Sequence, residues 1–438
     1  MTDLLKMAKY ETYKDSGIDW LGAIPSEWNL VPGFMAYSEN KRNNKGLKEE
    51  QVLSLSYGKI IIKPKEKLVG LVPESFETYQ IVEPGDLIIR CMDLQNDKTS
   101  LRTGLSVNHG IITSAYLNLK INEKYHSKFL YYYLHSLDTT KVLYKFGTGL
   151  RQNLSFQDFY RLPVFDIPKS LQTAIANFLD KKTDQIDEAV AIKQQQIELL
   201  KERKQIIIQQ TVTQGLDPNV PMKDSGVDWI GRIPKHWEVK RLKYVLTERN
   251  ERSKTGEEPL LMMSQIHGLV VRADYHAKAE VAASNVDNKI VYKNDLVFNK
   301  LKAHLGVFFK SNIDFKGLVS PDYAVYQPKA YIEDMRYLEV LFRNPKYIEQ
   351  FVIRATGIVE GLIRLYTDDL FDIAVPIAHA NEQRAILKYI DVESKKYDIA
   401  IKLQQEQIEK LKEYKTTLIN SAVTGKIKVP QNQESVLS

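Results

Sequence analysis

The sequence predicts an α+β protein with two mostly-β domains and small helices, joined by two long helices that pack as an antiparallel coiled coil. Three observations predict this fold class. A motif near the start of the chain recurs in its second half, and the residues between the copies are rich in short runs of strand formers. Each half also ends in a long segment whose apolar residues follow a coiled-coil period. The recurrence gives the fold an internal pseudo-twofold repeat.

The repeat rests on two pairs of motifs. Residues 14–28 read KDSGIDWLGAIPSEW and residues 223–237 read KDSGVDWIGRIPKHW, an offset of 209. QTAIANFLDKKTDQIDEAV begins at Gln172 and QRAILKYIDVESKKYDIAI begins at Gln383, an offset of 211. Solenoid repeats have periods of roughly 20–50 residues, so this unit is a whole domain with its connector. Two domains with the same repeated motifs but diverged sequence between them suit a protein that recognises two different targets at a fixed separation.

The repeat divides the 438 residues into five predicted segments. They are a first β domain (1–168), a first long spacer helix (169–216), a second β domain (217–378), a second long spacer helix (379–428) and a polar tail (429–438). Each β domain has the length of an ordinary folded domain.

Composition limits the possible classes of function. The chain is 43% hydrophobic and 10% aromatic, which is typical of globular domains. Its net charge of +6 agrees with a polyanionic partner, although many proteins share such a balance. Cys91 is the only cysteine, so an intramolecular disulfide framework and a cysteine-based zinc cluster are excluded, and a reducing cytoplasm is expected. The chain shows no apolar signal-peptide core and no membrane-spanning run, so neither secretion nor membrane insertion is expected.

Short elements are predicted within each half. VLSLSYGKIII, YQIVEPGDLIIRCM and GIITSAYLNLKI read as strands, as do EPLLMMSQIHGLVV, KIVYKNDLVFNKL and GLVSPDYAVYQP in the second half. Residues 83–86 (EPGD) have the Pro and Gly of a type II turn. HSKFLYYYLHSL and MRYLEVLFRNPKYIEQFVI each read as a helix. Core packing is expected for the four tryptophans Trp20, Trp28, Trp229 and Trp237.

The long helices carry a predicted packing seam. The apolar a and d positions are Ile186, Val190, Ile197, Leu200, Ile207 and Thr211 in the first helix, and Tyr397, Ile401, Ile408, Leu411, Leu418 and Ala422 in the second. Polar residues interrupt both seams at matching places, namely Lys193 and Lys204, and Gln404 and Lys415. Matched interruptions favour packing of the two helices on each other. An ordinary amphipathic helix on a globular core is the alternative.

Basic and amide side chains gather in the divergent regions beside glycine-containing loops. In the first domain they are Arg90, Gln95, Asn96, Lys98, Arg102, Lys145, Arg151, Gln152 and Asn153. In the second they are Asn299, Lys300, Lys302, His304, Arg354 and Arg364. Arg and Lys suit guanine edges and phosphates, and Asn and Gln can pair bidentately with adenine. Each cluster is predicted to contact DNA, while for any single residue a solvated surface group is the alternative.

Two near-matches to methyltransferase motifs do not predict catalysis. Residues 344–347 (NPKY) differ by one residue from the tetrapeptide that holds a flipped adenine in amino-methyltransferases, but they lie in a helical context. Residues 146–149 (FGTG) do not open a βαβ unit, as a cofactor-binding glycine loop would. HExxH, P-loop and GxSxG motifs are absent, and the eight histidines show no metal-ligand spacing. No catalytic or metal-binding residue is therefore predicted.

Several of these motifs, in this order, carry a family resemblance. They are the opening motif, the Gly85-Asp86 and Asn294-Asp295 turns, GTGLRQNL at 147–154, the Pro-then-Gln start of a helix at 168–172, and AVTGKI at 422–427. Together they resemble the specificity subunit of Type I restriction–modification systems over nearly the whole chain. The second copy departs from the Gly-Thr-Gly run at 355–362, and the first copy departs from AVTGK at 211–215.

The resemblance implies a non-catalytic DNA-binding subunit. Its two β domains would be target-recognition domains that each read half of a split sequence in double-stranded DNA, and the helices would be the spacer between them. The implied partners are two adenine methyltransferase subunits and motor/endonuclease subunits, with S-adenosylmethionine, ATP and magnesium expected in those partners. Helical residues 184–213 would span roughly 45 Å, which suits half-sites about one DNA turn apart.

Two other functions remain open at this point. One is an autonomous DNA-binding or architectural protein without methyltransferase partners. The other is an enzyme that uses the near-match motifs. Cofactor binding by the isolated chain would favour the enzyme, and adenine-methyltransferase genes beside this one would favour the subunit.

Overall fold

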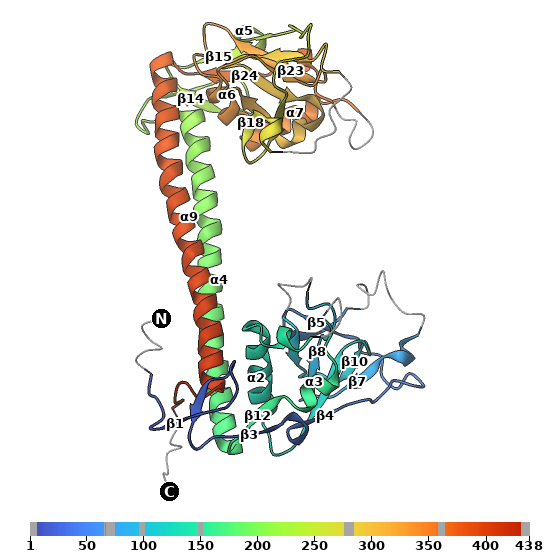
Figure 1. Ribbon diagram of the computed structural model, residues 1–438. Helices are drawn as coiled ribbons and strands as arrows, with labels where there is room; N and C mark the ends of the chain where they lie inside the picture. Colours follow the sequence, from blue (N-terminus) through green and yellow to red (C-terminus); the bar gives the residue numbers. More distant parts are fainter. Residues whose placement is uncertain are drawn as a thin grey trace. The chain divides into compact units, whose positions relative to one another are not determined.

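The computed structural model describes residues 7–64, 66, 75–95, 101–147, 152–275, 284–357 and 364–430, without the side chains of residues 303 and 304. The chain forms two compact units (Figure 1). Unit 1 comprises Met1–Gln194 and Gln405–Ser438, and unit 2 comprises Gln195–Gln404. Each unit therefore holds one β domain together with part of both long helices. Among the described residues, no helix has the length and apolarity needed to cross a membrane.

The β domain of unit 1 is built from antiparallel pairs around a four-stranded sheet. That sheet has the order β4 (Tyr37–Glu39), β11 (Leu117–Ile121), β8 (Leu87–Ile89) and β9 (Thr103–Leu105). The pairs are β1 (Tyr13–Asp15) with β2 (Ala23–Pro25), β3 (Asn29–Pro32) with β12 (Pro163–Asp166), β5 (Leu53–Ser56) with β6 (Lys59–Ile62), and β7 (Gln80–Val82) with β10 (Gly110–Ile112). The helices are α2 (Ser127–Thr139) and α3 (Phe156–Tyr160), with short 3-10 turns at Gly33–Met35, Phe76–Thr78 and Leu143–Lys145.

Unit 2 repeats this topology strand for strand. Its sheet has the order β16 (Leu246–Glu248), β23 (Tyr323–Pro328), β20 (Leu296–Asn299) and β21 (Phe308–Lys310). The pairs are β13 (Met222–Asp224) with β14 (Arg232–Pro234), β15 (Glu238–Arg241) with β24 (Ala374–Ile377), β17 (Leu261–Ser264) with β18 (Gly268–Val271), and β19 (Lys289–Val291) with β22 (Gly317–Val319). The helices are α5 (Leu242–Val245), α6 (Arg336–Leu341), α7 (Pro345–Arg354) and α8 (Thr367–Phe371), with 3-10 turns at Arg272–Asp274 and Lys300–Leu305.

The segment 335–353, predicted as a single helix, is two helices. α6 ends at Leu341 and α7 begins at Pro345. The Asn344 side chain caps α7 by accepting a hydrogen bond from the Lys346 backbone N–H at 3.0 Å. Proline fits the first helical position because its missing N–H would have no partner there, but it stops a preceding helix from continuing.

The predicted turn before the central strand is present in both units. Gly85 has φ +95°, and the Asp86 N–H donates to the Glu83 carbonyl at 3.1 Å, as a type II turn requires. In unit 2, Asn294 has φ +64° and the Asp295 N–H donates to the Tyr292 carbonyl at 3.2 Å. The recurring aspartate is therefore a turn residue, and burial is the main cause that raises the pKa of both Asp86 and Asp295.

The tryptophans of the opening motif pack into the cores, but their polar atoms differ between units. Trp28 and Trp237 are 2% and 0% exposed, while Trp20 and Trp229 are half-buried. The Trp237 indole N–H donates to Glu382 Oε2 at 2.9 Å. The Trp28 indole N–H has no partner among the described residues. By the offset of the helix motifs, Leu171 stands where unit 2 has Glu382, so the first copy lacks this acceptor.

The long helices are α4 (Lys169–Gln214) and α9 (Ala380–Val423). Each is anchored at its first turn by a buried glutamine. The Gln172 amide donates to the Ile167 carbonyl and the Gln383 amide to the Ala378 carbonyl, both at 2.8 Å. Each helix stops before a glycine with positive φ, Gly215 at +80° and Gly425 at +71°, as a left-handed C-terminal cap requires.

α4 and α9 contact each other within each unit. In unit 1, Lys415 Nζ lies 2.7 Å from Asp187 Oδ1, and Lys193 bonds Gln407. Residue numbers rise along one helix as they fall along the other, so the pairing is antiparallel. In unit 2, Lys204 Nζ lies 2.7 Å from Asp398 Oδ1.

The seam positions are the inward-facing ones. Ile186, Ile197, Ile408 and Leu418 are buried, and Val190, Leu200, Ile207, Ile401 and Leu411 are partly buried. All three lysines that interrupt the seam reach the opposite helix, Lys204 and Lys415 to carboxylates and Lys193 to the Gln407 amide, which is why the seam tolerates them. The predicted fold class, two mixed domains with two paired long helices, is confirmed.

Candidate nucleic-acid interface

In unit 1 the structure joins two of the predicted loops. The Asp93 N–H donates to Asn153 Oδ1 at 2.9 Å, and the Leu154 N–H donates to the Cys91 carbonyl at 2.8 Å. Gln95 and Asn153 are exposed on these segments, and Gln152 is half-buried with φ +49°. The loop after β8 and the segment after the glycine run therefore form one surface. Lys98, Asn96 and Arg151 lie outside the described residues.

Arg102 was predicted to contact DNA, and that prediction is wrong. Its side chain is fully buried. Its guanidinium donates to the backbone carbonyls of Arg90, Met92 and Asp93 at 3.1, 2.6 and 2.9 Å. Arginine has five N–H donors in a rigid fork, so it can hold several carbonyls of one loop at once. Arg102 therefore shapes the loop that carries Gln95, and no part of it is available to DNA.

The other two predicted residues of this domain lie apart from that surface or at its base. Lys145 is exposed and lines a cavity with Trp20, Asn420 and Lys426, near the end of α9. Arg90 is half-buried at the end of β8, where its backbone exchanges hydrogen bonds with Arg102. The structure thus places the exposed amides Gln95 and Asn153 together, and places Lys145 elsewhere in the unit.

In unit 2 three predicted segments meet. Thr356 and Arg364 exchange two backbone hydrogen bonds of 2.9 and 2.8 Å, and the Leu365 N–H donates to the Lys300 carbonyl at 3.1 Å. The stretch 299–302, the end of α7 and the strand-like residues 364–365 are thus neighbours. Lys302 is exposed and has no hydrogen-bond or ion-pair partner among the described residues. For His304 the structure describes no side chain.

The remaining cationic and amide groups of that cluster are already engaged. Arg354 donates to the Gln350 side chain at 2.6 Å, and Arg364 donates to Asp322 at 3.3 Å. Lys300 lies 3.7 Å from Glu248, and Asn299 accepts from the Leu301 N–H at 3.1 Å. Surface ion pairs of this kind are worth about 0–1 kcal/mol, so DNA phosphates could compete for Arg364.

The asparagine and the tyrosine of the NPKY segment make contacts that hold the fold. Asn344 caps α7, and the buried Tyr347 hydroxyl donates to the Ala374 carbonyl at 3.2 Å. Burial holds the pKa of Tyr347 well above its usual value. Neither group is free to hold a flipped adenine.

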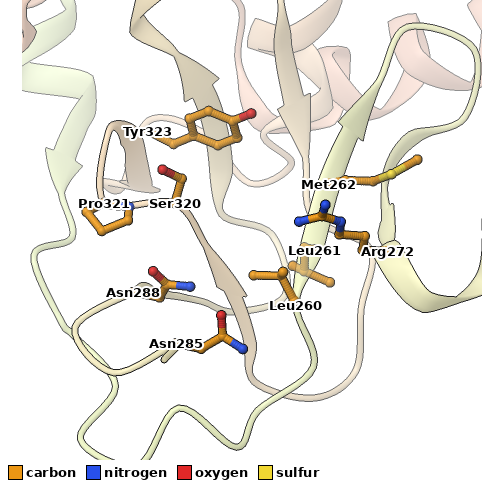
Figure 2. Close-up of a pocket in the computed structure, with 9 residues that line it drawn as sticks. All are labelled: Leu260, Leu261, Met262, Arg272, Asn285, Asn288, Ser320, Pro321 and Tyr323. Atoms are coloured by element: carbon orange, nitrogen blue, oxygen red, sulfur yellow. The ribbon is translucent and has the colours of Figure 1, made fainter. Parts of the chain in front are cut away.

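A cavity of about 480 Å³ in unit 2 contains polar residues that the sequence analysis did not single out (Figure 2). Its lining residues are Leu260, Leu261, Met262, Arg272, Asn285, Asn288, Ser320, Pro321 and Tyr323. Ligand sites typically combine an apolar lining with a few convergent polar groups. These residues come from four separate stretches of sequence, at 260–262, 272, 285–288 and 320–323, so no local motif marks them. Several of the polar ones lie next to strand ends: Arg272 directly follows β18, Asn288 directly precedes β19, and Ser320 directly follows β22.

The comparisons with known proteins agree with this architecture. No protein-family model matches the chain. In sequence the chain is similar to the Type I restriction enzyme MjaVIII specificity subunit of Methanocaldococcus jannaschii, at 23% identity over 336 residues, covering 73% of this chain and 75% of the relative.

Two solved structures are similar in fold. One is a chain from a study of complex assembly and conformational transition of the type I R-M system, with a TM-score of 0.65 and 16% identity, covering 92% of this chain and 99% of that one. The other is the HsdS subunit from Thermoanaerobacter tengcongensis, with a TM-score of 0.53 and 15% identity, covering 92% and 98%. The predicted likeness to Type I specificity subunits is confirmed in sequence and in fold.

Proposed function

We propose that this chain is the non-catalytic, sequence-specific DNA-binding subunit of a Type I restriction–modification complex. Each β domain reads one half of a split target, and the chain directs adenine methylation and restriction by partner subunits. One observation carries the proposal: both units have the same strand order, but they present different side chains at corresponding positions. Duplicated frames with different contents are what a protein needs to read two different half-sites.

The exposed groups support DNA as the ligand. The surface of unit 1 offers the amides of Gln95 and Asn153, and unit 2 offers Lys302 beside Arg364. Amides can read base edges, and cations grip phosphates in a salt-dependent way. The net charge of +6 agrees with a polyanionic ligand. A role on chromosomal DNA implies the cytoplasm as the compartment.

The two long helices support a spacer role. α4 and α9 have 46 and 44 residues, far longer than a helix needs to cover one small domain. Their pairing through Asp187–Lys415 and Lys204–Asp398 fixes an antiparallel register. In the proposal this register sets the number of base pairs between the half-sites.

An exposed apolar face in unit 2 supports a helical partner. Leu199 and Ile206 of α4 are seven residues apart and 64% and 36% exposed, and Leu403 of α9 is 52% exposed. Residues seven apart lie on one face of a coiled-coil helix. Exposed apolar stripes on paired helices are typical docking sites for another helix. We assign this face to a helix of an adenine methyltransferase subunit.

Methylome sequencing of cells with and without this gene tests the proposal. We expect adenine methylation of one split motif that depends on the gene. Exchange of residues 32–160 for those of a relative with another target should change one half-site and leave the other unchanged. Gene-dependent binding of the same split sequence without any methylation would favour an autonomous DNA-binding protein. Absence of any gene-dependent motif would contradict the proposal.

A further inference from the structure

The cavity of unit 2 has a polar side on which three side chains have no hydrogen-bond or ion-pair partner in the part of the chain that the structure describes. Figure 2 shows Arg272 and Met262 on one side of the cavity, and Asn285, Asn288, Ser320 and Tyr323 on the other. Among the described residues, the side chains of Arg272, Asn285 and Asn288 have no hydrogen-bond or ion-pair partner. They differ in this from Arg354 and Arg364, which are engaged elsewhere in the unit.

The backbone that carries these side chains is nevertheless fixed. The Arg272 N–H donates to the Leu260 carbonyl at 2.9 Å. The Asn288 N–H donates to the Asn285 carbonyl at 3.2 Å, and the Asn288 carbonyl accepts from the Ser253 N–H at 2.9 Å. Groups held on an ordered backbone lose little entropy when they bind a ligand. The cavity is thus a prepared site rather than a group of solvated side chains.

The same place in unit 1 can be located by hydrogen-bond register. The Lys63 N–H donates to the Val52 carbonyl at 2.8 Å, as the Arg272 N–H does to Leu260. Gln80 pairs with Ile112 in one unit, and Lys289 pairs with Val319 in the other. Counting from these pairs gives the corresponding positions Arg272 and Lys63, Asn285 and Phe76, Asn288 and Tyr79, Ser320 and Thr113, and Tyr323 and Tyr116.

The correspondence divides the cavity residues into two classes. A cation, a hydroxyl and a tyrosine occur in both units, but the two amides of unit 2 are replaced by Phe76 and Tyr79 in unit 1. Phe76 and Tyr79 pack edge to face with ring centroids 5.1 Å apart, so the exchange gives unit 1 an aromatic wall. Shared groups suit a feature that every target has, such as phosphate. Groups that differ suit a feature that distinguishes targets.

We propose that Asn285 and Asn288 are specificity-determining residues that read an adenine in the second half-site, and that Arg272 grips the DNA backbone beside it. This inference rests on the proposed function. An Asn amide can pair bidentately with adenine, because its N–H donates to the N7 acceptor and its Oδ1 accepts from the N6 amino group. The apolar neighbours Leu260, Met262 and Pro321 exclude water around that pair of hydrogen bonds.

The test compares matched variants in cells that carry the complete complex. Asn288→Ala and Asn285→Ala should relax one adenine position of the second half-site, with a loss of discrimination of about 5- to 150-fold per bidentate contact. Asn285→Phe combined with Asn288→Tyr, the side chains of unit 1, should abolish the preference at that position. The first half-site should stay unchanged in every variant.

Arg272→Ala provides the matched contrast. It should weaken binding of the complex to duplexes of any sequence and lower the slope of log affinity against log salt by about one, without changing the preferred bases. Lys63→Ala, at the corresponding position of unit 1, should leave the second half-site intact. Methylome sequencing gives the motif, and titration of duplex DNA at two salt concentrations gives the slope.

The outcomes separate this inference from the proposed function. If the wild-type complex yields a split motif but the asparagine variants keep it unchanged, the cavity does not read bases and the proposed function stands. If the wild type yields no split motif, the proposed function itself fails. If an alanine variant loses all methylation, Asn288→Asp serves as the second variant. An unchanged preference for adenine in Asn288→Asp would overturn the inference, because a carboxylate cannot donate to N7.

Discussion

Replacement of Arg102 by methionine should loosen the loop that carries Gln95. Methionine fills much of the same volume but has no donors, so the carbonyls of Arg90, Met92 and Asp93 would lose their partner. A buried acceptor without a partner costs about 1–3 kcal/mol, which gives about 3–9 kcal/mol for three before relaxation. Water can reach this loop because Gln95 is exposed, so we expect a cost near the lower end, about 3–5 kcal/mol.

Hydrogen exchange is the suitable assay, because a chain with two units need not unfold in one transition. The amides of Leu94 and Leu154, which bond across the loop to Gln152 and Cys91, should exchange faster in Arg102→Met. Peptides of unit 2 should be unaffected. Gln95→Ala is the matched control, since loss of an exposed side chain changes stability by less than about 0.5 kcal/mol. Equal protection of residues 90–95 in Arg102→Met and wild type would refute the role given to Arg102.

Three further predictions concern the framework. Glu382→Leu should destabilise unit 2 by about 1–3 kcal/mol in thermal unfolding, because the Trp237 N–H loses its acceptor. Leu171→Ala, at the equivalent place in unit 1, removes no acceptor, so equal hydrogen-exchange protection of Trp237 in the two variants would contradict this prediction. Burial lowers the pKa of His135 to about 4, so the contribution of the neutral imidazole to the free energy of unfolding is fully present above about pH 6.5 and falls by about 3 kcal/mol as the pH drops toward 4. His135→Phe should remove this acid-dependent loss of stability. Insertion of four residues after residue 200 and four after residue 402, which the Lys204–Asp398 register places opposite, should widen the methylated motif by about two base pairs, and an unchanged gap would exclude a spacer role.

The fold could be predicted to this extent because its signals are local. The repeat is visible in short motifs, and the helix seams are visible as a period of 3.5 residues. α4 ends directly before Gly215, whereas α9 ends two residues before Gly425. The tail motifs of the two copies, at 211–215 and 422–426, also place this glycine differently. The division at Pro345 was readable as well, because a proline after an asparagine is a common helix start.

The candidate site could be predicted only in part, because burial and pairing depend on tertiary contacts. Arg102 and Gln95 are similar in sequence as polar residues of one loop, yet one is fully buried and the other exposed. Arginine is seldom buried, so no sequence signal favoured the observed position. Asn285 and Asn288 were missed for the opposite reason: they lie in no basic cluster, and their meeting with Arg272 depends on strand pairing.

The turn before the central strand indicates how the two copies can differ without losing the fold. Asp86 accepts from Arg42 at 2.9 Å, and Asp295 accepts from Arg249 at 2.9 Å. These arginines are not at equivalent positions, because the residue of unit 1 that corresponds to Arg249 is Asn40. The Arg249 N–H donates to the Val325 carbonyl on the neighbouring strand, and the Asn40 N–H donates to the Asn118 carbonyl in the same way, both at 2.8 Å. The buried carboxylate needs a donor, and each copy supplies it from a different residue. When a residue that supports the fold differs between the two copies, another residue of the same copy therefore takes over its hydrogen bond. Among the described residues, the amides of Asn285 and Asn288 have no partner, which is expected if the ligand, and not the fold, determines those side chains.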